Sequence, residues 1–62
     1  MDQKTLIARL RQLLAADKNA FDIYTELAKL TKDHDQRRIF SAIAEDEKRH
    51  TLLSVEMLSL LE

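Results

Sequence analysis

Three residues whose side chains bind metals occupy positions that a helical protein would bury. Glu47 and His50 are three residues apart, so on a helix they share one face. That face also carries an apolar stripe, where a charged side chain is costly unless it is paired or bound to a cation. Asp17 interrupts a matching stripe in the first half of the chain. Carboxylate and imidazole ligands suit iron, manganese or zinc, so the pattern predicts a metal site at Asp17, Glu47 and His50.

Each of these residues, and two of their neighbours, also has an interpretation without a metal. Glu47 and His50 would form an exposed ion pair, and Asp17 would be a buried polar residue that fixes register and oligomeric state. Tyr24 lies two turns beyond Asp17 on the same face. It either hydrogen-bonds a metal-bound carboxylate or donates an electron, or it is a core aromatic residue. Asp46 either orients the His50 imidazole or is a solvated carboxylate.

The composition restricts the class of protein. The 62 residues form one domain, 1–62, with no Gly, no Pro and no Cys. Without cysteine there is no disulfide and no thiolate site. No apolar run approaches the ~20 residues of a membrane span, and the N-terminal segment does not resemble a signal peptide, so we expect a cytoplasmic protein. The net charge is -1, with basic residues interspersed among acidic ones, which argues against nucleic-acid binding.

Apolar residues recur at the spacing of three and four that is typical of packed helices. The first half has a seam at Leu6, Leu10, Leu13, Asp17, Ala20, Tyr24, Leu27 and Thr31, and a second stripe at Ile7, Leu14, Phe21 and Ala28. The second half has a seam at Ile39/Phe40, Ile43, Glu47, His50, Leu53/Ser54, Met57 and Leu60/Leu61. The phase changes between residues 31 and 36, which argues against one continuous helix of about 60 residues. Asp33 or Asp35 can cap a new helix there.

The sequence therefore predicts an all-α fold, an antiparallel hairpin with helices over about 3–32 and 36–61 and a turn at about 33–35. Pairing across such a turn sets Asp17 opposite residue 51, at the height of Glu47 and His50. The apolar faces are too wide for one partner helix. We therefore expect two hairpins to associate as a four-helix bundle, most simply a two-fold dimer, with larger even assemblies as the alternative. The dimer would bring together two Asp, two Glu and two His.

These residues resemble the ferritin-like superfamily, in particular its rubrerythrin and encapsulated-ferritin branches. The matching segments are Asp17-x-x-Ala20-x-x-x-Tyr24-x-x-Leu27-Ala28 and Ile39-Phe40-x-x-Ile43-Ala44-x-x-Glu47-x-x-His50-x-x-Leu53. The resemblance implies two iron ions per hairpin pair, with manganese or zinc as alternatives. It implies Glu47 as a bridging ligand, His50 as a terminal ligand of one ion, and Asp17 as either a bridging or a terminal ligand. It also implies an encapsulin shell as a partner, and hence a protein nanocompartment as a location. The first-helix ligand of the family is normally Glu, and this chain has Asp17 instead.

Three functions are compatible with this pattern. The first is a ferroxidase-like protein that oxidises Fe(II) with dioxygen or peroxide for iron storage or detoxification. The second is a metal-free dimeric hairpin used for assembly. The third is a small RNA-binding dimer of the Rop type, which would need its basic residues gathered on one outer face.

Overall fold

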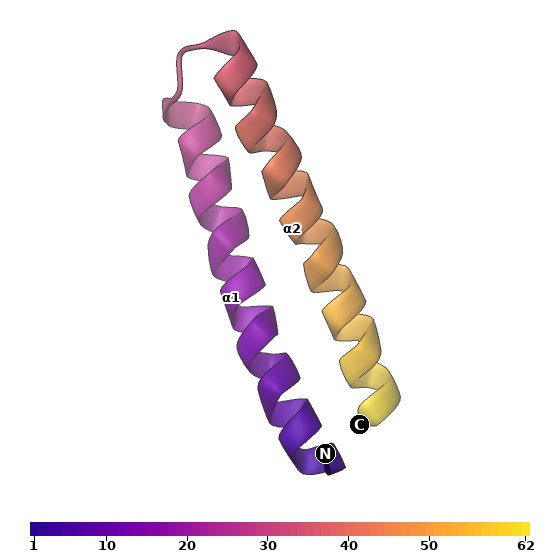
Figure 1. Ribbon diagram of the computed structural model, residues 1–62. Helices are drawn as coiled ribbons and strands as arrows, with labels where there is room; N and C mark the ends of the chain where they lie inside the picture. The colour runs from indigo at the N-terminus through magenta and orange to yellow at the C-terminus, as the bar shows by residue number, and fades with distance from the viewer.

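The computed structural model describes residues 1–62 as two helices of equal length. Helix α1 spans Gln3–Leu30 and helix α2 spans His34–Leu61. They run antiparallel and side by side, so that both termini lie at one end of the hairpin and the turn lies at the other (Figure 1). The all-helical hairpin agrees with the expected fold class. The turn is residues 31–33, because α1 ends two residues before the predicted boundary and α2 begins two residues before it.

Aspartate side chains start both helices. The Asp2 carboxylate accepts a hydrogen bond from the Thr5 backbone N–H, and the Asp33 carboxylate accepts one from the Gln36 backbone N–H at 2.9 Å. Each bond satisfies one of the free N–H groups at a helix N-terminus. The bonds from Thr5 also lower the pKa of Asp2 below its ordinary value of 3.8. Of the two capping residues expected for the second helix, Asp33 is the one used.

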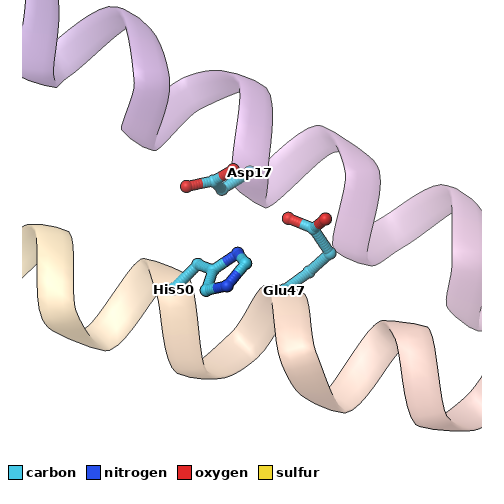
Figure 2. Close-up of side chains that lie close together, drawn as sticks. All are labelled: Asp17, Glu47 and His50. Atoms are coloured by element: carbon cyan, nitrogen blue, oxygen red, sulfur yellow. The ribbon is translucent and has the colours of Figure 1, made fainter.

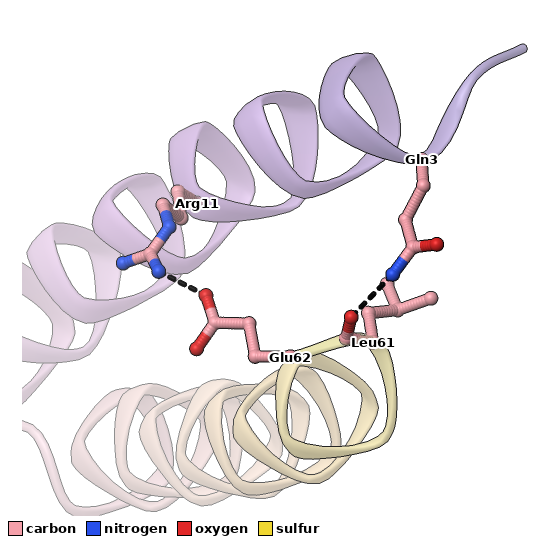
Figure 3. A network of polar contacts seen from close by, with 4 residues as sticks. All are labelled: Gln3, Arg11, Leu61 and Glu62. Atoms are coloured by element: carbon pink, nitrogen blue, oxygen red, sulfur yellow. Dashed lines mark hydrogen bonds and ion pairs between the residues drawn. The ribbon is translucent and has the colours of Figure 1, made fainter.

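Polar contacts close the hairpin at both ends. At the turn, the Arg37 guanidinium donates two hydrogen bonds, of 3.0 and 3.1 Å, to the Thr31 carbonyl oxygen. At the other end the Gln3 amide donates to the Leu61 carbonyl oxygen, and Arg11 forms an ion pair with Glu62 (Figure 3). The bonds to Thr31 and Leu61 use carbonyl oxygens that the ends of the helices leave without an intrahelical partner, whereas Arg11 pairs with the side-chain carboxylate of Glu62.

The interior of the hairpin is thin. Only Ala44 and Leu58 are buried among the 62 residues. The helices face each other through half-buried side chains: Ile7, Leu10, Leu14, Asp17, Ala20, Phe21, Tyr24, Thr25, Leu27 and Ala28 of α1, and Phe40, Ile43, Glu47, Thr51, Ser54 and Leu61 of α2. Thr31, in the turn, is also half-buried. Of the residues in the predicted seams, Leu6, Leu13, Leu53, Met57 and Leu60 are exposed in the single hairpin. Each predicted seam mixes the stripe that faces the other helix with a flanking stripe that faces outward.

Some of the exposed apolar residues define what we call the open face: Leu6, Leu13, Ile39, Leu53, Met57 and Leu60. Leu13 lies four residues before Asp17 on α1, and Leu53 and Met57 lie three and seven residues after His50 on α2, so they share helix sides with those residues. The antiparallel register sets Leu13 near the height of Leu53. Exposed apolar side chains therefore recur along the side of the hairpin that also carries Asp17 and His50.

The hairpin is a rod and does not form a closed core. It measures 46 × 14 × 14 Å, and its radius of gyration of 14.3 Å exceeds the value of about 10.6 Å expected for a compact chain of this length. Its solvent-accessible area is 5017 Å². A compact monomer of 7.2 kDa would expose about 4,100 Å², so the isolated hairpin exposes about 900 Å² more. Neither helix contains a stretch that is long and apolar enough to cross a membrane.

Candidate metal centre

The antiparallel pairing brings Asp17 of α1 to Glu47 and His50 of α2. One donor atom from each side chain lies within 4.8 Å of the other two. Figure 2 shows the two carboxylates and the imidazole pointing toward one another across the space between the helices. A cation with bonds of about 2.1 Å needs donors no more than about 4.2 Å apart. The three side chains are therefore within a small rotation of a common coordination sphere.

The three ligand candidates differ in burial. Asp17 and Glu47 are half-buried, whereas His50 is exposed. The predicted seam includes His50, but in the single hairpin His50 lies outside the contact between the two helices. Thr51 lies there instead, and its hydroxyl donates a hydrogen bond of 3.0 Å to the Glu47 carbonyl oxygen. The imidazole lies at the edge of the open face, where a second molecule can reach it.

Glu47 gives the strongest indication that the cluster suits a cation. Its Oε2 atom is buried and has no hydrogen-bond partner. A buried carboxylate oxygen without a partner is costly, because it has lost water and gained nothing in return. The two ion pairs in the structure join Arg11 to Glu62 and Arg49 to Asp46, so neither neutralises Asp17 or Glu47. A divalent cation between these carboxylates would supply both the charge and the missing partner, and the donor set fits it.

The two predicted neighbours of the site are placed differently from the three ligands. Tyr24 packs against Phe40, with ring centroids 6.3 Å apart and the planes inclined by 35°, which is the geometry of a core aromatic pair. Asp46 is exposed and its carboxylate lies 3.7 Å from the Arg49 guanidinium. No hydrogen bond joins Asp46 to His50, so the carboxylate does not orient the imidazole in this structure.

Two features around the site were not predicted from the sequence. One is Thr51, whose hydroxyl bonds to the Glu47 carbonyl oxygen. A threonine four residues after a helical carbonyl often forms this bond, so the spacing could have predicted it. The other is a set of lysines without ion-pair partners on the opposite flank of the hairpin. These lysines are far apart in the sequence, and the pairing of the helices places them on one side. The lining of the two hollows on that flank includes Lys18, Lys29 and Lys48.

The fold and the cluster define a helical hairpin that gathers two carboxylates and an imidazole beside an exposed apolar face. Comparison with family models, with curated proteins and with solved structures gave no significant match. The ferritin-like resemblance therefore rests on the motif residues and on their geometry.

Proposed function

We propose that the protein is a ferritin-like di-iron protein whose site is completed when two hairpins join through their open faces. It would oxidise Fe(II) with dioxygen or peroxide, for iron storage or detoxification. The observation that carries the proposal is the convergence of Asp17, Glu47 and His50, with Glu47 Oε2 buried and unpartnered.

The open face supports the pairing of two hairpins. The hairpin as a whole exposes about 900 Å² more than a compact monomer, which is close to the roughly 800 Å² that each partner buries in an interface of standard size. The open face also borders the three ligand candidates, so a two-fold partner would bring its own copies to the same place. The four carboxylates then carry about the charge of two divalent cations.

The ligand candidates would have different tasks in that site. The carboxylates of Asp17 and Glu47 each offer two oxygens and are suited to bridge two ions, whereas the single imidazole donor of His50 would hold one ion. Fe(II) is the substrate of the proposed reaction. Each Fe(II) gives up one electron, so a pair reduces dioxygen with two protons to hydrogen peroxide, or reduces peroxide with two protons to water.

Anaerobic loading with Fe(II), followed by elemental analysis and then by exposure to oxygen, tests the proposal. We expect two iron ions per hairpin pair and an absorbance rise from Fe(III) once oxygen is admitted. Glu47→Ala and His50→Ala should abolish iron binding. Glu26→Ala is the matched control, because Glu26 is an exposed helical carboxylate outside the cluster. Equal loss of iron in the Glu26 and Glu47 variants, or no iron in the wild-type protein, would overturn the proposal.

Binding should also stabilise the fold. Occupation of each site at a hundred times Kd adds roughly 2.7 kcal/mol to the free energy of unfolding. Thermal melts with Fe(II), Mn(II), Co(II) and Zn(II) measure this directly. If none of the four ions raises the melting temperature, the cluster is not a metal site.

The open face also favours the second candidate function, a metal-free dimeric hairpin used for assembly. In that case Glu47→Ala would leave dimerisation intact and no metal would bind the wild type.

Encapsulation is a further part of the first proposal and rests on the resemblance alone. Co-purification of the protein with a co-expressed encapsulin shell would support it, and a shell that remains empty would remove it.

A further inference from the structure

A two-helix layer has a groove on each side, and the groove away from the three ligand candidates is hollowed along much of its length. Two hollows of about 560 and 370 Å³ lie along it and share Phe21 in their lining. The larger includes Ala28 and Ala44, nearer the turn, and the smaller includes Leu14 and Val55, nearer the termini. Asp17, Glu47 and His50 line neither hollow.

The charged residues around this groove are mostly basic. Lys18 and Lys48 line the smaller hollow, and Lys29 and Arg37 line the larger one, where Glu45 is the single acidic residue. The whole chain has 10 basic and 11 acidic residues, so four basic groups against one acid is a segregation and not the background composition. The hairpin therefore has a basic groove although the net charge of the protein is slightly negative.

The lysines of the groove have no ion-pair partner in the protein. The two ion pairs of the structure involve Arg11 and Arg49, which line neither hollow. Arg37 uses its guanidinium on the Thr31 carbonyl oxygen. Because Lys18, Lys29 and Lys48 are free of internal carboxylates, an anionic partner can pair with them without breaking an existing contact.

The floor of the groove decides the class of partner. Leu52 and Val55 are exposed apolar residues, and with Leu14 and Phe21 they line the smaller hollow. A partner that only carries phosphates would leave this apolar surface in water, whereas the apolar stripe of a helix fills a groove of this kind. Acidic residues on either side of that stripe would meet the lysines at the rim.

We propose that this basic groove docks an acidic amphipathic helix of a partner protein. The apolar stripe of the partner covers the floor at Phe21, Leu52 and Val55, and its Asp and Glu side chains pair with Lys18 and Lys48. Because the open face lies on the other side of the hairpin, the partner helix and a second hairpin can bind at the same time. The basic groove contains none of the three ligand candidates, so docking there does not depend on the metal site.

The test measures the anisotropy of labelled model peptides titrated with the full chain. The probe is a helical peptide of about 15 residues with leucines at helical spacing and glutamates beside them. One comparison peptide replaces the glutamates with lysines, another replaces the leucines with serines, and single-stranded RNA serves as a further ligand. We expect the acidic leucine peptide alone to bind, and its affinity to fall as salt is raised.

Adjacent residues supply the matched variants. Lys48→Glu should weaken peptide binding at least about tenfold, because it places like charges opposite each other. Arg49→Glu makes the same change of charge outside the groove and should change the affinity less than about twofold at physiological salt, where the Debye length is about 8 Å. Leu52→Ala should weaken binding where Leu53→Ala does not. All four residues are exposed, so circular dichroism should show unchanged helix.

Three results would overturn the proposal. The first is the absence of binding by the acidic leucine peptide at high micromolar concentration. The second is an equal effect of Lys48→Glu and Arg49→Glu, which would indicate attraction by general charge. The third is preference for RNA or for the serine peptide, which would show that the apolar floor takes no part. Iron loading should be the same in Lys48→Glu and in the wild type, so the outcome does not depend on the metal centre.

Discussion

Leu53 and Leu52 are neighbours in sequence that the hairpin turns to opposite sides, and their truncation should have different effects on self-association. Leu53 is 57 % exposed on the open face, and Leu52 is 63 % exposed beside the basic groove. Full burial of a leucine is worth about 1.5–3 kcal/mol, so covering the exposed part of Leu53 is worth roughly 0.9–1.7 kcal/mol. A two-fold interface contains the residue twice, which gives about 1.7–3.4 kcal/mol.

Leu53→Ala should therefore raise the Kd of the hairpin dimer roughly 20- to 300-fold, at 1.4 kcal/mol for each factor of ten. Sedimentation equilibrium over a range of protein concentrations measures this Kd. Leu52→Ala is the control, since it removes the same atoms from a similarly exposed site and should leave the Kd within about twofold. Equal effects of the two variants would refute the assignment of the open face as the dimer interface. A wild-type protein that stays monomeric at millimolar concentration would do the same.

Other substitutions and a change of pH test single residues. Asp17→Asn should lower the iron stoichiometry without dissociating the dimer, and Asp17→Leu should stabilise the metal-free protein while abolishing Fe(II) oxidation, as elemental analysis and thermal melts would show. Asp33→Ala should cost about 1 kcal/mol by removing the cap of α2, which lowers the melting temperature by about 5 °C. The pKa of Asp2 is lowered by its bonds from Thr5, so its stabilisation of α1 should be complete above pH 3.8 and disappear as the pH falls through the lowered pKa. The NMR shift of the Thr5 amide reports this loss, and in Asp2→Asn the acid-range change should be absent.

The hairpin and the convergence of the three ligand candidates could be predicted from sequence because both follow from periodicity. The phase change near residue 33 requires two helices, and counting outward from a short turn places Asp17 opposite Glu47 and His50. The predicted turn was displaced by two residues because Thr31 and Lys32 are compatible with a helix in isolation. The Asp33 cap and the Arg37 bonds to the Thr31 carbonyl oxygen place the turn at residues 31–33, two residues earlier than predicted.

The assignment of sides to the hairpin could not be predicted as well. A wide apolar face has the same periodicity whether it meets one neighbour or two, so the sequence could not separate the inner stripe from the open face. This is why His50 was expected inside the contact and is found at its edge, with Thr51 inside. The basic groove was missed for a related reason. Lys18 and Lys48 are 30 residues apart in sequence, and only the pairing of the helices places them at one hollow.

The turn has a consequence for how two chains exchange parts. No residue of the protein has a positive φ angle, and neither glycine nor proline occurs at the connection. Stereochemistry therefore does not forbid residues 31–33 from becoming helical; the Asp33 cap and the contact between α1 and α2 keep them extended. If the connection straightens, α2 of one chain can lie against α1 of another with the same inner contacts. Domain swapping between hairpins is thus opposed by the Asp33 capping bond and by the contacts that close the hairpin. At high protein concentration, the Asp33→Ala variant should form swapped dimers sooner than the wild type.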